Sequence, residues 1–166
     1  IFEGRNSSVG ERSMLGVVQE VASALADKPL GQLASFDQMF AGIRASLKSA
    51  NQRATLNAES SGKLSELALR LLKALFLVKY VDGFKASPRN LTVLVYDRFG
   101  TDLTALSKDV IEALAALEVQ TYIQRNGDVY DYLTNEEQKI EQEIKNVDID
   151  SSEVSKKLSD LLTQSV

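Results

Sequence analysis

Apolar residues recur at steps of three and four along most of the chain, a spacing typical of helices that bury one face. The first such stretch predicts a helix from about Arg12 to Asp27, which Pro29 and Gly31 end. The apolar face expected for this helix comprises Met14, Leu15, Val18, Val21 and Leu25.

A second helix is predicted to begin at Ser35, because Gln38 follows it three residues later in the form of a capping box. Its apolar positions make one continuous stripe: Phe36, Met39, Phe40, Ile43, Leu47, Ala50 and Ala54. The pattern stops at Ser60-Ser61-Gly62. We therefore interpret residues 1–62 as a helical segment of two packed helices.

Three further helices are predicted after Lys63. They span about Leu64–Val81, Arg89–Arg98 and Asp102–Glu118, and Ser87-Pro88 provides an N-cap and a first-turn proline for the second of them. The core positions expected in the first are Leu67, Leu71, Leu72, Leu75, Phe76 and Val78. Those expected in the third are Leu103, Leu106, Val110, Ile111, Leu114 and Leu117.

A β-hairpin is predicted next, from two β-favouring runs at Val119–Gln124 and Val129–Leu133. Asn126-Gly127 lies between them and is a strong hairpin signal, because both central turn positions are expected to need positive φ. Helix, short helix, turn, helix and hairpin is the order of a winged helix-turn-helix domain, which we predict for residues 63–147. An all-helical bundle with an incidental hairpin is the alternative.

The C-terminal part predicts two more helices. A second capping box, Thr134 to Glu137, begins a helix whose inward face is expected to carry Ile140, Ile144 and Val147. Asp150-Ser151-Ser152-Glu153 begins the last helix, within residues 148–166, with Val154, Leu158, Leu161 and Leu162 on one side. The fold class is thus mainly α: a helical segment, a winged helix with a small hairpin wing, and a C-terminal helix.

Composition narrows the chemistry of the chain. It has no cysteine and no histidine, so disulfides, thiolate metal sites and His-based triads are excluded. No apolar run approaches the ~20 residues that span a bilayer, so no membrane partner is expected. The lack of cysteine fits a reducing cytoplasm. The chain begins Ile1-Phe2-Glu3-Gly4 without a signal segment, and we expect it to be a fragment of a longer protein.

The net charge of the third predicted helix after Lys63 argues against sequence-specific DNA binding through this helix. The helix predicted at 102–118 is the one that would enter the major groove, yet it carries four acidic residues and one base, Lys108, a net charge of −3. The phosphates that line the major groove would repel this acidic helix. Arg125 and Asn126 at the tip of the wing, with Lys108, remain the candidate nucleic-acid contacts. We therefore predict that the domain has a structural role or binds a partner protein, with direct DNA binding as the alternative.

Motifs for catalysis are incomplete. Ser60-Ser61-Gly62-Lys63 lacks the first glycine of a phosphate-binding loop and the hydroxyl residue after the lysine. Glu136-Glu137, Glu141 and Glu143 fit a solvated helix face, paired at helical spacing with lysines. We predict no catalytic residue, no metal site and no cofactor in this chain.

Several stretches resemble the large P-loop ATPase of bacterial BREX phage-defence systems. The strongest lie at 74–81, 83–86, 120–130 and 132–137, and Gly10-Glu11-Arg12-Ser13-Met14-Leu15 resembles the segment that follows the ATPase core. The resemblance implies a lid-like helical segment and a winged helix of an AAA+-like ATPase. The parent protein would bind ATP and Mg²⁺, whereas this chain has no nucleotide-binding loop of its own.

The resemblance also implies a site and partners. A base near such a lid can contact a nucleotide, and Arg12, with Arg5 second, is the residue we nominate. Expected partners are other subunits of the defence complex or further copies of the chain, with DNA as an alternative. Two other hypotheses stay open: a winged-helix transcription regulator that binds operator DNA, and a helical adaptor that docks through the stripe from Phe36 to Ala54.

Overall fold

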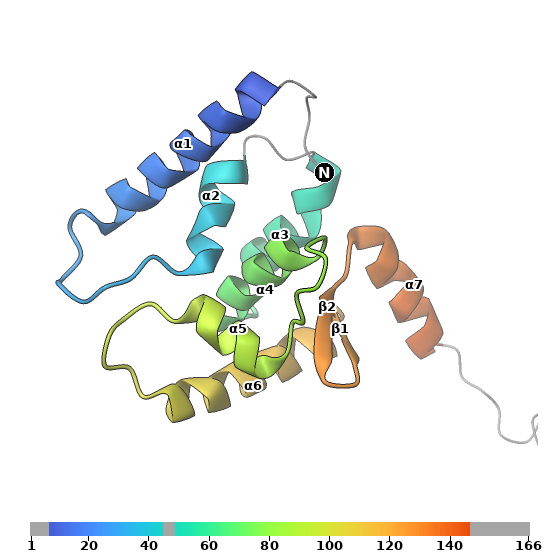
Figure 1. Cartoon of the computed structure of the whole chain (residues 1–166). Coiled ribbons are helices and arrows are strands. Elements are labelled where there is room, and N and C mark those ends of the chain that lie inside the picture. The colour runs from blue at the N-terminus through green and yellow to red at the C-terminus, as the bar shows by residue number, and fades with distance from the viewer. Residues whose placement is uncertain (1–6, 45–48, 147–166) are drawn as a thin grey trace, which may run out of the picture.

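The computed structural model describes residues 7–44 and 49–146, and the side chains of these residues except those of 7–13, 49–52 and 146. It is mainly helical, with one small antiparallel hairpin among the described residues (Figure 1). The elements are α1 Ser7–Leu25, the 3₁₀ helix η1 Phe36–Gln38, α2 Met39–Ile43, α3 Ser49–Ser61, α4 Glu66–Val78, α5 Pro88–Val95, α6 Leu103–Val119, β1 Ile123–Asn126, β2 Val129–Tyr132 and α7 Asn135–Asn146. The predicted last helix lies outside the described residues.

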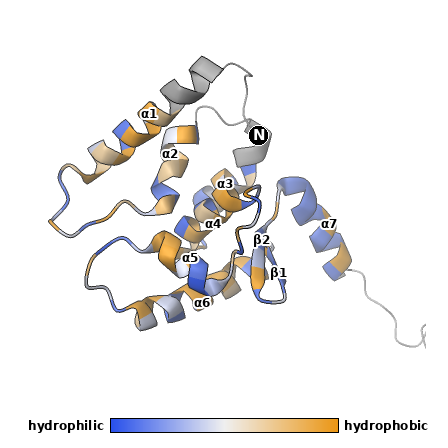
Figure 2. Ribbon diagram, viewed as in Figure 1, coloured by the Kyte–Doolittle hydropathy of each residue, from blue (hydrophilic) through white to orange (hydrophobic). Residues whose placement is uncertain are grey.

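Helix α4 lies at the centre and contacts α3, α5, α6 and β2. The Ser65 side chain caps it by accepting a hydrogen bond from the Ala68 amide. Its apolar residues Leu71, Leu72 and Leu75 are almost completely buried, as the periodicity predicted. Figure 2 shows the contrast between this apolar helix and the largely hydrophilic α7. In the described part of the chain, no helix combines the length and apolarity needed to cross a membrane.

Helices α5 and α6 begin where their local signals predicted. Ser87 accepts from the Asn90 amide at the start of α5, and Asp102 accepts from the amides of Thr104 and Ala105 at the start of α6. These side chains satisfy amides that have no partner within the helix.

The buried face of α6 differs from the predicted one. Val110, Leu114 and Leu117 are buried as expected, but Leu103 and Ile111 are 54% and 51% exposed. Ala113, which the pattern did not single out, is buried with the first three at steps of three and four. Ile111 is one residue, or about 100°, away from Val110 around the helix, so it falls beside the buried face.

The hairpin is confirmed with a different start and a different turn. Helix α6 continues through Val119, Thr121 then takes a positive φ of 62°, and β1 begins at Ile123. Asn126 pairs with Val129, so the two turn residues are Gly127 and Asp128. Only Gly127 has positive φ (61°), as expected where glycine holds the first central position of a type II′ turn.

Aromatic contacts join the hairpin to the helices. The ring centroids of Phe76 and Tyr132 are 5.3 Å apart, and those of Phe40 and Phe76 are 5.5 Å apart, both edge to face. The Thr55 hydroxyl and the buried Tyr132 hydroxyl share a hydrogen bond of 3.1 Å. One hydrophobic core thus includes residues from both sides of residue 62, where the sequence predicted a boundary.

The predicted continuous helix from Ser35 to Ala54 is wrong. Its start is the 3₁₀ turn η1, its middle is the five-residue α2 ending at Ile43, and α3 is a separate helix that begins at Ser49. Ser35 makes no capping hydrogen bond. Phe40 and Ala54 are both buried, because α2 and α3 pack their apolar sides into the shared core. These parts of the stripe are therefore not available to dock another subunit; Leu47 lies outside the described residues, as does the side chain of Ala50.

The predicted apolar face of α1 is also corrected. Met14, Leu15 and Val18 are each at least 65% exposed. Among the described side chains of α1, Val17 is the buried one, and Val21 and Leu25 are half-buried. Helix α1 packs on α2, and a Cβ added at Gly42 would lie 2.7 Å from the Val17 Cα. The absence of a side chain at Gly42 is what permits this close approach.

Replacing Gly42 with alanine should lower the free energy of unfolding by about 1–3 kcal/mol, because the added methyl group forces α1 away from α2. Gly16→Ala is a matched control, since Gly16 lies in α1 with open space around it. The control should be stabilising by up to about 1 kcal/mol through helix propensity. Urea denaturation measures both; equal effects in the two variants would contradict the close packing.

Helix α7 begins with the capping box predicted at Thr134. The Thr134 amide donates to Glu137 Oε2 at 2.7 Å, and the Glu137 amide donates to the Thr134 hydroxyl at 3.4 Å. The predicted inward face is wrong, however, because Ile140 and Ile144 are 59% and 61% exposed. Val147 lies outside the described residues.

Candidate functional site

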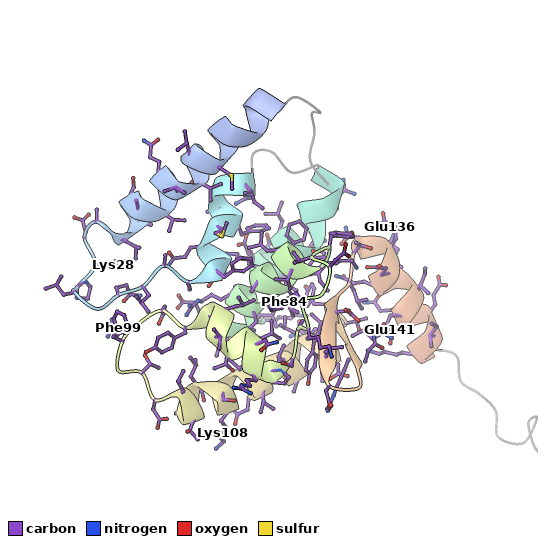
Figure 3. All side chains as sticks on the ribbon, in the orientation of Figure 1. Lys28, Phe84, Phe99, Lys108, Glu136 and Glu141 are labelled. Carbon is purple, nitrogen blue, oxygen red and sulfur yellow. The ribbon has the colours of Figure 1, made fainter. Side chains whose placement is uncertain are left out.

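The three candidate nucleic-acid residues lie at two places. Lys108 is exposed in the first half of α6, toward the end of the helix remote from β1 (Figure 3). Arg125 and Asn126 are exposed at the hairpin tip. Both tip residues contact their own hairpin: Arg125 Nε donates to the Gly127 carbonyl at 2.9 Å, and Asn126 Nδ2 donates to Asp131 Oδ2 at 2.6 Å. Arg125 also stacks near the Tyr130 ring, 5.8 Å from its centroid.

The outer side of α6 combines apolar and acidic residues. Leu103, Ile111 and Val119 are 54%, 51% and 82% exposed. At 100° per residue, Ile111 and Val119 lie about 80° apart on the outer side of the helix, whereas Leu103 is exposed because it is the first residue of α6. Asp109 and Glu112 are exposed beside them. We call Leu103, Ile111, Val119, Asp109 and Glu112 the α6 surface. Apolar groups with acidic neighbours suit contact with a protein better than contact with phosphates.

The structure does not describe the side chains of the two residues nominated for nucleotide contact, Arg12 and Arg5. Arg12 belongs to α1, and its side chain lies outside the described ones. Arg5 lies outside the described residues.

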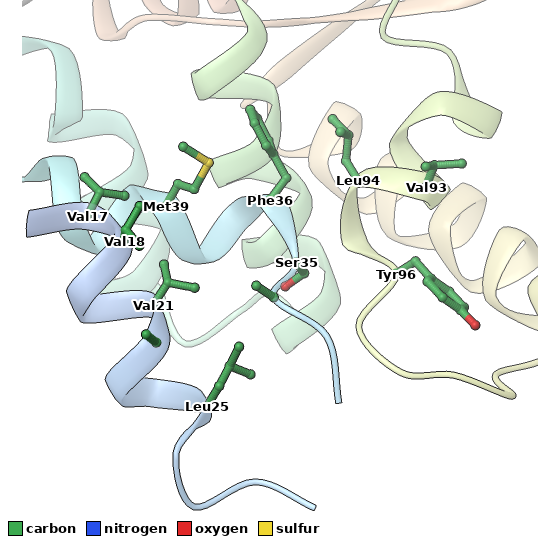
Figure 4. Close-up of a pocket in the computed structure, with 12 residues that line it drawn as sticks. Val17, Val18, Val21, Leu25, Ser35, Phe36, Met39, Val93, Leu94 and Tyr96 are labelled. Carbon is green, nitrogen blue, oxygen red and sulfur yellow. The ribbon is translucent and has the colours of Figure 1, made fainter. Parts of the chain in front are cut away.

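An apolar groove of about 500 Å³ lies between α1, the η1–α2 segment and the end of α5 (Figure 4). Val18 and Val21 of α1 line one side, while Val93 and Tyr96 line the other. The Ser35 hydroxyl is buried at this groove without a hydrogen-bond partner. The sequence did not predict this groove, because it forms only where segments distant in sequence meet.

A charged cluster joins three segments around Arg70 of α4. Its guanidinium lies 2.9 Å from Asp97 and 3.4 Å from Asp37, and it donates to the Val95 carbonyl at 2.7 Å. The Asp37 side chain is only 8% exposed. Arg70 therefore satisfies a buried carboxylate and a carbonyl at the end of α5, which is a structural role.

A second cluster joins α4 to α7. Lys79 Nζ donates to the Tyr132 carbonyl and to Glu137 Oε2, each at 2.6 Å. Burial alone would raise the pKa of Glu137, but the hydrogen bonds from Lys79 and Thr134, together with the Lys79 charge, outweigh it and lower that pKa. Glu137 is therefore a carboxylate at neutral pH, serving both the cap of α7 and its attachment to α4.

The Lys79–Glu137 contact should make stability depend on pH. Since the pKa of Glu137 is lowered in the folded state, its contribution is present above the ordinary value of 4.5 and is lost as pH falls through the folded value. The difference in free energy of unfolding between wild type and Glu137→Gln should be greatest near pH 7 and shrink below about pH 4.5. Glu136→Gln, on the same helical turn, is the control. Urea titrations between pH 7 and pH 3 measure the difference, and a constant value would contradict this role.

No group of three or more acidic residues in the described ranges is arranged to hold a metal ion. Burial raises the pKa of Tyr132, although its hydrogen bond with Thr55 partly opposes this, so the phenol stays protonated at neutral pH. The acidic residues of α7 lie along a largely exposed helix, as labelled Glu136 and Glu141 show in Figure 3.

The comparisons with known proteins assign no family. No protein-family model matches the sequence. No solved structure matches the chain either.

Proposed function

We propose that this chain is a non-catalytic part of an AAA+-like ATPase in a bacterial phage-defence (BREX) complex in the cytoplasm. In this proposal the helices before residue 62 are lid-like, and residues 63–147 are a winged helix that docks a partner protein. The winged helix would couple the nucleotide state of the parent ATPase to engagement of that partner. The observation that carries the proposal is the α6 surface.

The arrangement of α4, α5, α6 and the hairpin supports a winged-helix interpretation. Helices α4, α5 and α6 contact one another, and the hairpin follows α6 directly and packs against both α4 and α6. The Tyr130 amide in β2 donates to the Ala86 carbonyl just before α5, at 3.0 Å. This bond brings the segment just before α5 alongside β2.

The α6 surface supports protein docking over groove binding. In a helix-turn-helix, α6 would be the helix that enters the major groove. Its exposed leucine, isoleucine and valine would each lose contact with water against a protein, with a gain of about 25 cal/mol per Å² buried. Against DNA, Asp109 and Glu112 would face phosphates.

Ile111→Lys in the intact ATPase tests the docking role. If the α6 surface binds a partner subunit, this variant should weaken binding of that subunit about ten-fold or more, the usual size for a central interface residue. Basal ATP turnover should be unchanged. Val81→Lys is a matched control, because Val81 is 52% exposed, like Ile111 at 51%, and lies outside α6. Equal effects of the two variants on partner binding would contradict the proposal.

Arg12 is tested separately. If it contacts nucleotide in the parent protein, Arg12→Ala should lower ATP turnover while partner binding through α6 persists. Unchanged turnover would remove this part of the proposal and leave the docking role intact.

The exposed Arg125 at the hairpin tip favours one alternative, a winged-helix regulator that binds DNA directly. An exposed guanidinium at a wing tip can enter a minor groove. This alternative predicts tight, sequence-dependent DNA binding by the isolated chain.

A further inference from the structure

The walls of the apolar groove between α1, the η1–α2 segment and the end of α5 are tied together by direct contacts. On the α1 side, the backbone at Val17 packs on α2 at Gly42, where an added Cβ would lie 2.7 Å from the Val17 Cα. On the α5 side, Arg70 binds Asp37 of η1 at 3.4 Å and the Val95 carbonyl at 2.7 Å. The groove is therefore preformed, as small-molecule sites usually are.

The lining of the groove is apolar and uncharged. None of the described residues that line it has a carboxylate, ammonium or guanidinium group. Val18 of α1 and Val93 of α5, on opposite walls, are 65% and 66% exposed, and Met39 of α2 is 39% exposed. An apolar molecule that covers these side chains removes them from water, which is favourable. A charged group in the same place would lose water without gaining a counter-charge.

One polar atom is buried at the groove without a partner. Ser35 is only 3% exposed, and its hydroxyl makes no hydrogen bond with any described atom. It also fails to cap η1, whereas Ser65 and Ser87 cap α4 and α5. Figure 4 shows Ser35 between the two walls. A buried hydroxyl without a partner is costly, and a hydrogen-bonding group on a bound molecule would remove that cost.

The volume of the groove, about 500 Å³, lies within the range of about 300–1,000 Å³ that small-molecule sites occupy. Such sites are mostly apolar, with a few polar groups that orient the ligand. We propose that this groove binds a small neutral molecule with an apolar body and one hydrogen-bonding group, which pairs with the Ser35 hydroxyl. The site shares no residue with the α6 surface, so this proposal is independent of the proposed docking role.

Phenylnaphthylamine is a suitable probe, because it is neutral, largely apolar and has one N–H group that the Ser35 oxygen can accept. Its fluorescence rises in apolar surroundings, so titration into the full chain gives a Kd. Octanol should displace the probe at concentrations at least about ten-fold lower than octanoate, whose charge finds no partner in the lining. Equal displacement by the two competitors, or no saturable binding of the probe, would overturn the proposal.

Ser35→Ala tests the hydrogen bond to the bound molecule. It should weaken probe binding about five-fold, as expected for the loss of one hydrogen bond. It should also raise the urea midpoint of the unliganded chain, because it removes a buried hydroxyl that has no partner. Ser23→Ala is the matched control, since Ser23 is exposed on α1 and does not line the groove. Unchanged probe binding in Ser35→Ala, or a lowered urea midpoint, would overturn the pairing with Ser35.

Val93→Asp tests the location of the site, because it places a carboxylate on one wall at an exposed position that should not impair folding. Probe binding should weaken at least about ten-fold. Val81→Asp is the control: Val81 is 52% exposed and lies outside this groove, so binding should persist. Equal loss in the two variants would overturn the proposal. Self-association of the chain that Val93→Asp abolishes, measured by light scattering, would also overturn it and assign the groove to a second copy.

Discussion

Replacing Arg70 with methionine should lower the free energy of unfolding by about 3 kcal/mol, because it leaves the nearly buried carboxylate of Asp37 without its counter-charge. The value is at the low end for a broken buried pair, since the Arg70 side chain is 21% exposed. The same change removes a donor from the Val95 carbonyl at the end of α5. Urea denaturation measures the loss.

Lys73→Met is the matched control for Arg70. Lys73 lies on the same helix and pairs with Glu59 at 2.8 Å, but both partners are about a quarter exposed. Its loss should cost less than about 1 kcal/mol. Adding Asp37→Asn to the Arg70 variant should restore part of the lost stability by removing the uncompensated charge. If the Arg70 and Lys73 variants are equally stable, the Arg70 cluster does not hold the three segments together.

Replacing Tyr132 with alanine should lower the free energy of unfolding by about 3–5 kcal/mol, as expected when a fully buried aromatic ring is removed. Tyr132 stacks edge to face on Phe76 and bonds to Thr55, so the ring contributes to the core shared by residues on both sides of residue 62. Urea denaturation and loss of near-ultraviolet circular dichroism would both report the change.

Tyr132→Phe separates the hydroxyl from the ring. It should cost about 1 kcal/mol, the usual net value of one hydrogen bond. With Thr55→Val it forms a double-mutant cycle, in which the two single effects should not add, because each removes the same 3.1 Å bond. Additive effects in the cycle would contradict a direct Thr55–Tyr132 contact.

Local sequence signals predicted where helices begin more accurately than periodicity predicted which of their faces are buried. Asp102, Ser87 and Thr134 each cap the helix that follows, since a cap depends on a side chain and amides two or three residues away. Ser35 has the same sequence form and fails, because it lies in the tertiary contact between η1, α1 and α5. Its surroundings are set by residues distant in sequence.

Periodicity predicted five of the six core residues of α4 correctly, with Leu67 only partly buried, but it failed on helices at the edge of the fold. It identifies an apolar stripe without saying what covers the stripe. In α6 the neighbouring helices cover Val110 and Ala113 and leave Leu103 and Ile111 exposed. In α7 both isoleucines are exposed beside the hairpin. The candidate docking residues thus came from errors in the predicted core.

The apolar groove and the Arg70 cluster could not be predicted from the sequence. Asp37, Arg70 and Asp97 lie on three segments, and no spacing rule relates them. The contact between Gly42 and Val17 is similar, because only the crossing of α1 and α2 gives that glycine its role.

The most direct test of the role of the α6 surface is a DNA-binding titration. The folded chain is titrated into fluorescently labelled duplex DNA, and anisotropy is measured at low and at physiological salt. The result distinguishes docking of a protein from recognition of DNA. Docking predicts a Kd no tighter than about 10⁻⁶ M at physiological salt, the range of non-specific binding. Lys108→Ala and Arg125→Ala should then change binding little and equally for all duplex sequences. Nanomolar, sequence-dependent binding that either variant abolishes would contradict the docking role and assign the chain to DNA recognition.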